Sequence, residues 1–168
     1  MKNILFLLAL TVLIFGCDKK KQPAEYMKEA KLSIEQKKIT ETVKAYETLI
    51  SEFPNDSLAP EAIYQLGTLY QNKMVPNYKE TESLVKAVNI FKSVFDKYPN
   101  SKKAPVSLFM AAFIQANDLK NYQEATAIYN LFLQKYPKND MAPAARDELN
   151  NMGLSPEQII VKKDETKK

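Results

Sequence analysis

The side chains that most often carry out catalysis are scarce in this sequence. The chain has 168 residues with no histidine and one cysteine, Cys17. Histidine is the usual general base and the commonest metal ligand, so no Ser-His-Asp triad or Cys-His pair can form. Adjacent carboxylates such as Asp147 and Glu148 diverge on a helix instead of facing each other. The sequence therefore predicts a non-enzymatic protein with no metal, no cofactor and no small-molecule substrate, and an enzyme that uses a carboxylate pair is the remote alternative.

Cys17 lies where a lipid anchor would be attached. Lys2 precedes an apolar run at residues 4–15, which is too short to cross a bilayer core of ~30 Å. The run ends in "LIFGC" and charged residues follow. This junction resembles a bacterial lipobox, which implies cleavage before Cys17 and lipids on its thiol and new amino group. The alternative is an ordinary secretory peptide with an incidental buried cysteine. We predict a lipoprotein signal peptide at 1–16 and a lipid-anchored tether at 17–22.

The charge pattern argues against nucleic-acid binding. Lys and Arg number 24 against 20 for Asp and Glu, a net charge of +4, and Arg146 is the only arginine. A nucleic-acid-binding protein is expected to carry a basic stripe and arginine forks. The last segment, residues 161–168, is charged and lacks periodic apolar residues, so we predict a disordered tail there.

One eight-residue segment occurs three times. It reads "FPNDSLAP" at 53–60, "YPNSKKAP" at 98–105 and "YPKNDMAP" at 136–143. Proline disfavours helical conformation in the residue before it, so a helix is expected to end at each aromatic. The second proline then lies in the first turn of the next helix, where its missing N–H is tolerated. This segment, called the joint below, predicts a helix, a tight turn and another helix, in stacked units.

The helices on either side of the joints share an apolar pattern. Seven residues before each joint aromatic lies another aromatic, at Tyr46, Phe91 and Tyr129, as expected for one buried face of a helix. The helices after the joints carry Gly67 and Ala112 at matching positions, where a neighbouring helix can approach closely. Helices are predicted at residues 22–36, 39–52, 58–72, 80–97, 103–117, 121–135, 141–151 and 156–160.

These features resemble the tetratricopeptide repeat (TPR) family. The resemblance covers residues 23 to about 152 and rests on the small residue of each first helix, on "NYQEA" at 121–125 and on the closing aromatic-proline pair. It implies an all-α solenoid of helical hairpins, with about three repeats and a C-terminal capping helix at 141–151. The TPR domain is thus expected at 23–152 and a short helix within 153–160. The joints are similar to those of bacterial periplasmic TPR lipoproteins, of the BamD and CpoB types.

In the TPR family the first helix of each pair lines a concave groove. The resemblance places nine residues of this chain there: Met27, Lys31, Ile34, Tyr64, Thr68, Gln71, Phe109, Phe113 and Asn117. The alternative for Tyr64, Phe109 and Phe113 is that they are core residues between helices, because aromatic residues at helical spacing are most often buried.

The resemblance implies a scaffold that binds a protein or peptide partner in the bacterial cell envelope. The chain would face the periplasm from a lipid anchor, with the outer membrane favoured over the inner. Assembly of outer-membrane proteins is the most specific role that the resemblance implies. Coordination of envelope constriction or cell division, through Tol-Pal or peptidoglycan, is the alternative.

Overall fold

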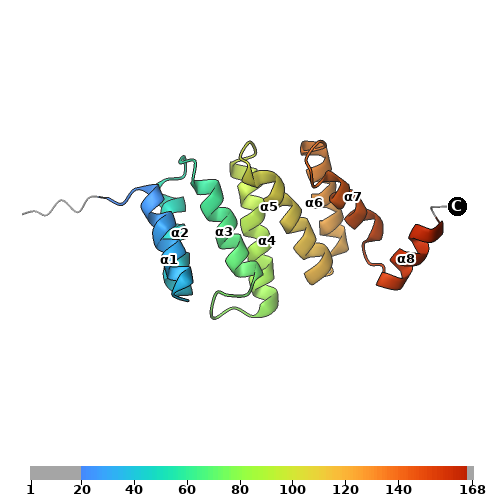
Figure 1. The fold of residues 1–168 in the computed structure, drawn as a ribbon, viewed down its shortest axis with the longest axis horizontal. Coiled ribbons are helices and arrows are strands. Elements are labelled where there is room, and N and C mark those ends of the chain that lie inside the picture. Colours follow the sequence, from blue (N-terminus) through green and yellow to red (C-terminus); the bar gives the residue numbers. More distant parts are fainter. Residues whose placement is uncertain (1–19, 166–168) are drawn as a thin grey trace, which may run out of the picture.

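The structure is a computed structural model, and it describes residues 20–165 as a row of helices with no strand in that range (Figure 1). The predicted all-α fold is confirmed. In chain order the elements are α1 (Pro23–Glu35), α2 (Ile39–Glu52), α3 (Ala59–Gln71), α4 (Glu80–Lys97), α5 (Lys103–Phe113), the π-helix η1 (Ile114–Asp118), α6 (Tyr122–Lys135), α7 (Ala142–Asn151) and α8 (Pro156–Glu165).

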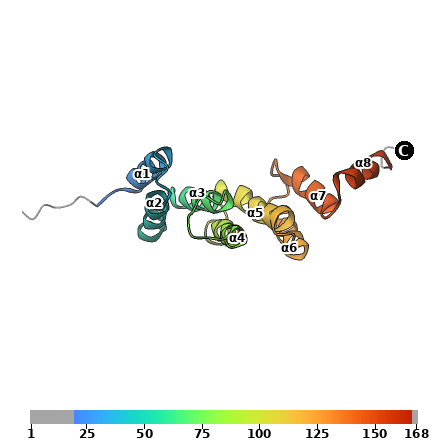
Figure 2. The ribbon, with the colours of Figure 1, turned by 90° about the horizontal axis from the view of Figure 1, so that it is seen from below.

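The helices form two layers. Figure 2 shows α1, α3, α5 and α7 along one side of the molecule and α2, α4 and α6 along the other. From α1 to α7 each helix packs against the next one along the chain. No hairpin buries its apolar face alone, so neighbouring hairpins supply the cover, as in other solenoids. The predicted helical-hairpin solenoid is confirmed.

The predicted apolar face of the second helices forms the core. Tyr46 is 4% exposed, and Phe91 and Tyr129 are fully buried. An added Cβ on Gly67 would lie 2.8 Å from Cε1 of Phe91, so α3 and α4 can approach this closely only because position 67 has no side chain. The prediction that Gly67 marks a close helix contact is confirmed.

Each joint builds the same turn. The helix before it ends at the aromatic, whose φ is −131° at Phe53, −135° at Tyr98 and −129° at Tyr136. Three residues later, a polar side chain accepts a hydrogen bond from the backbone N–H two positions further on, at 2.8 Å for Asp56, 3.2 Å for Ser101 and 3.0 Å for Asn139. Short polar side chains stabilise turns in this way.

One predicted helix is wrong in its last turn. Residues 103–117 were expected to form one α-helix, but α5 ends at Phe113 and η1 follows, with the N–H of Leu119 donating to the carbonyl of Ile114 at 2.9 Å. The left-handed residue that ends this segment, Lys120, lies eight residues after Ala112, whereas Lys73 lies six after Gly67. The wider π turn accommodates the longer segment.

The predicted C-terminal boundary is also wrong. Helix α8 continues to Glu165, so residues 161–165 are helical and not part of a disordered tail. Ser155 and Gln158 cap its start, because the N–H of Ser155 donates to Oε1 of Gln158 at 2.8 Å. Nζ of Lys162 donates to the carbonyl of Asn150 at 2.6 Å, which places a cation at the C-terminal end of α7, where the helix dipole favours it.

Some predictions fall beyond the part of the chain that the structure describes. The signal peptide at 1–16, the lipid site Cys17 and residues 166–168 all lie there. Within residues 20–165, no helix combines the length and the apolar character needed to cross a membrane.

Candidate partner-binding face

The predicted groove residues belong to one layer of the solenoid. We call the side formed by α1, α3, α5 and α7 the first-helix face (Figure 2). Lys31 and Asn117 are exposed on it, and the other predicted groove residues are half-buried: Met27, Ile34, Tyr64, Thr68, Gln71, Phe109 and Phe113. The face therefore presents apolar side chains that are partly in the core and partly accessible to a partner.

Three of the predicted residues line one hollow. Met27, Lys31 and Ile34 border a hollow of about 580 Å³. Its lining also includes Lys28 and Glu35 of α1, Tyr46 of α2 and Gln65 of α3. The sequence had assigned Tyr46 to the core only, because its spacing before the joint is that of a buried residue. We call this the α1–α3 hollow.

Tyr64 and Phe109 serve the core as well as the face. The ring centroid of Tyr64 lies 5.6 Å from that of Phe91, and the Phe109 centroid lies 5.5 Å from Tyr129 and 5.9 Å from Phe132. Both rings are packed against the buried cluster, yet neither is fully covered. Tyr64 and Phe109 are therefore partly core residues and partly exposed on the first-helix face. Replacing these rings would disturb packing as well as binding, so they are poor probes of binding alone.

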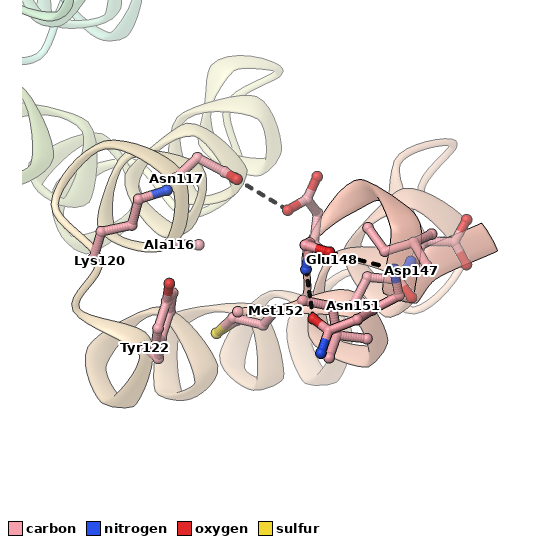
Figure 3. A pocket seen from close by; sticks show the side chains of 13 residues that line it. Ala116, Asn117, Lys120, Tyr122, Asp147, Glu148, Asn151 and Met152 are labelled. Atoms are coloured by element: carbon pink, nitrogen blue, oxygen red, sulfur yellow. Dashed lines mark hydrogen bonds between the residues drawn. The ribbon is translucent and has the colours of Figure 1, made fainter. Parts of the chain in front are cut away.

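Asn117 lies in a second hollow, away from the α1–α3 hollow. This end pocket has a volume of about 480 Å³ and is bordered by η1, the first residue of α6, α7 and the start of α8 (Figure 3). Nδ2 of Asn117 donates to Oε2 of Glu148 at 3.1 Å. The sequence analysis placed Asn117 in the groove with the other eight residues, and it predicted residues 141–151 only as a capping helix. Asp147, which lies eleven residues after its joint aromatic as Tyr64 and Phe109 do, was the available indication of this pocket.

A buried hydroxyl lies close to the end pocket. Tyr129 is fully buried, and its hydroxyl has no hydrogen-bond partner among the described residues. Burial raises the pKa of Tyr129 above its usual range, and the negative charge of Glu148 raises it further. The neutral hydroxyl is therefore strongly favoured in the folded state.

Among the described side chains, no group of three or more His, Cys, Asp or Glu residues is placed to hold a metal ion.

The two-layered stack of hairpins with a half-exposed apolar face defines a helical repeat protein. Residues 26–56, 61–101 and 106–139 match the tetratricopeptide repeat family, in step with the hairpins α1–α2, α3–α4 and α5–α6. The chain belongs to the tetratricopeptide repeat family. No curated protein matches it. Proteins of this family are generally non-enzymatic scaffolds for protein–protein interaction, and the repeats of this chain indicate such an interaction scaffold.

Proposed function

We propose that this protein is a lipid-anchored scaffold of the bacterial cell envelope that binds an extended protein segment on its first-helix face. The α1–α3 hollow is the observation that carries the proposal, because it brings Met27, Lys31 and Ile34 together at an accessible site. An apolar floor with a charged rim suits one anchoring side chain of a partner. Helical repeat surfaces bind extended segments through many such contacts.

The described part of the chain that follows the proposed anchor begins at one edge of the solenoid. Helix α1 begins at Pro23, six residues after Cys17, so the connection can reach at most about 20 Å. Figure 1 shows α1 starting at the same long edge of the molecule, the upper one in this view, as the three joints. Lys20 pairs with Glu52 at 3.3 Å, and its Nζ lies 5.1 Å from the ring centroid of Phe53 in the first joint. A lipid on Cys17 would hold the joint edge close to the bilayer and leave the first-helix face open to the periplasm.

The specific role that we propose is assembly of outer-membrane β-barrel proteins. The lipobox-like "LIFGC" and the joints support it, since both are similar to those of the periplasmic TPR lipoproteins that serve this process. The outer membrane is accordingly the proposed location, with an unfolded barrel precursor or another assembly protein as the partner. Such partners expose extended apolar segments, which the α1–α3 hollow would accept.

Depletion and complementation test this role. Loss of the protein should lower the amount of folded barrel protein in the outer membrane, measured by heat-modifiable gel mobility. Wild-type protein should restore it, and the variant Lys31→Glu/Ile34→Ser should not. The matched control Lys44→Glu/Asn130→Ser changes exposed residues of α2 and α6 and should restore it fully. Normal barrel levels combined with defective division would contradict the assembly role and favour envelope coordination instead.

A further inference from the structure

Two carboxylates at the end pocket form no ion pair with a described side chain. Glu148 is half-buried and Asp147 is exposed, and both line the pocket. Among residues 20–165 none of the ion pairs involves either carboxylate. The single side-chain hydrogen bond to Glu148 there comes from the neutral amide of Asn117. A partly buried carboxylate is stabilised by a paired cation. Lys120 lines the same pocket but forms no ion pair with either carboxylate.

An aromatic ring forms another wall of the same pocket. Tyr122 is 41% exposed, and an added Cβ on Gly153 would lie 3.5 Å from its Cε2, so the ring rests on the glycine backbone. The φ of Gly153 is +79°, a conformation that favours glycine. Figure 3 shows Tyr122 and Met152 on one side of the pocket and Glu148 on another. No cation of the described residues lies over the Tyr122 ring.

The interior beside the pocket adds a second unsatisfied group. The hydroxyl of Tyr129 is buried without a hydrogen-bond partner among the described residues. The negative charge of Glu148 contributes to the raised pKa of this hydroxyl. Buried polar groups are nearly always paired, and an exception calls for an explanation. The π-helix η1, which places Asn117 against Glu148, is another local departure from regular structure that is frequent at functional sites.

We propose that the end pocket binds the cationic side chain of an arginine or lysine in the partner segment. The carboxylates of Glu148 and Asp147 would accept charge-assisted hydrogen bonds, and the cation would lie over the face of Tyr122. A volume of about 480 Å³ is ample for one such side chain. This inference rests on the proposed function, because the pocket closes the C-terminal end of the first-helix face, along which the partner would lie. Lys120 is also at the pocket, so binding of an anion is the competing outcome.

A titration followed by NMR tests the proposal without any partner protein. Residues 18–168, which contain every described helix, are labelled with ¹⁵N and titrated with N-acetyl-arginine amide. N-acetyl-citrulline amide matches its shape without charge, and N-acetyl-glutamate amide carries the opposite charge. We expect saturable shifts of the amides of Asn117, Glu148 and Gly153 with the arginine compound, at roughly millimolar affinity. The citrulline compound should bind at least about tenfold more weakly.

Two variants assign the effect to the pocket. Glu148→Gln keeps the shape and removes the charge, so it should weaken binding of the arginine compound at least about tenfold. Glu47→Gln, at an exposed carboxylate of α2 that lines neither hollow, is the matched control and should leave the affinity unchanged. If Glu148→Gln does not fold, the variant Tyr122→Leu, which removes the exposed ring, tests the same site. It should lower the affinity for the arginine compound several-fold.

Three results would overturn the proposal. They are equal binding of the arginine and citrulline compounds, shifts near Lys120 with the glutamate compound alone, or no shifts at the pocket with any compound. The complementation experiment above reports on the α1–α3 hollow and does not involve these residues. A negative result for cation binding in the end pocket can therefore be distinguished from a negative result for the proposed partner-binding role.

Discussion

The hydroxyl of Tyr136 donates a 2.8 Å hydrogen bond to the carbonyl of Pro99, the proline of the preceding joint. Tyr98 makes the same bond, at 2.6 Å, to the carbonyl of Pro54 in the first joint. Phe53, the aromatic of the first joint, has no joint before it and no hydroxyl. The joint thus does two things: it turns the chain between helices, and it fastens each repeat to the one before. This explains why the chain contains the same short segment three times.

Removing either hydroxyl should weaken the stack. Tyr98→Phe and Tyr136→Phe should each lower the free energy of unfolding by about 1 kcal/mol, the net value of a typical hydrogen bond. Because both rings are half-exposed, even alanine should cost less than the ~3–5 kcal/mol lost with a fully buried ring. Urea unfolding measures these changes. Tyr122→Phe is the control, and an equal effect in all three variants would contradict a role for the hydroxyls.

A methyl group on Gly67 should push α3 away from α4. Gly67→Ala places Cβ 2.8 Å from Cε1 of the fully buried Phe91, and overpacking of this kind costs about 1–3 kcal/mol. In the background Phe91→Leu, the facing ring is gone and Gly67→Ala should cost much less. Thermal melts of the four proteins form a double-mutant cycle. Additive changes would show that the two residues do not meet.

Replacing the left-handed lysine after a first helix by glycine should raise the free energy of unfolding. Lys37 and Lys120 have φ values of 61° and 54°, in the left-handed region that costs a side-chain-bearing residue roughly 1–2 kcal/mol. Lys37→Gly and Lys120→Gly should therefore raise the free energy of unfolding by up to about 1 kcal/mol. The control Lys44→Gly, in the middle of α2, should lower it by about the same amount. A loss of stability in Lys37→Gly would mean that the lysine side chain contributes more than the strain.

Strong alkali should unfold the protein through Tyr129. Burial raises the pKa of this tyrosine, so above pH ~10 the unfolded chain releases a proton that the folded chain keeps. The stability contributed by the neutral form is present below pH ~10 and falls as pH rises beyond it, by up to about 1.4 kcal/mol per pH unit. Tyr129→Phe should remove this part of the slope. At pH 7 it should be neutral or slightly stabilising, since an unpartnered buried hydroxyl is lost.

Urea midpoints of wild type and Tyr129→Phe between pH 8 and 11 give the answer. The two curves should diverge above pH ~10. Parallel curves over the whole range would show that Tyr129 does not titrate differently in the folded state.

Membrane attachment should depend on Cys17. Cys17→Ser removes the thiol that would carry the lipid, so the variant should remain unprocessed or be released from carbonate-washed membranes. Fractionation with immunodetection and the mass of the mature N-terminal peptide report both properties. Normal retention and normal processing of Cys17→Ser would rule out the anchor.

The fold was largely predictable because its determinants are local. The boundaries of α2 at 39–52 and of α4 at 80–97 agree with the helix predictions. Proline ends helices through contacts with its immediate neighbour, and apolar spacing follows the helical period. The length of α8 was missed because residues 161–165 are mostly charged and lack the periodic apolar residues that marked the other helices.

The candidate site was predictable only where it follows the repeat. Met27, Lys31 and Ile34 share one face of one helix, and the structure brings them into one hollow. The surroundings of Asn117 depend on the π turn and on how α7 and α8 close the end of the solenoid. Neither feature repeats along the chain, so the repeat spacing did not reveal the end pocket, and Asp147 was its one indication in the sequence.

The most direct test of the account is a site-specific photo-crosslinking map of the two layers. A benzophenone amino acid replaces Lys31 or Gln71 on the first-helix face, and Lys44 or Asn130 on α2 and α6, in the full chain expressed in its own bacterium. After irradiation of intact cells, adducts are identified by mass spectrometry. We predict that one partner protein is crosslinked by the benzophenone at position 31 and at position 71, and at neither control position. Capture of that partner only from Lys44 and Asn130, or equally from both layers, would contradict it.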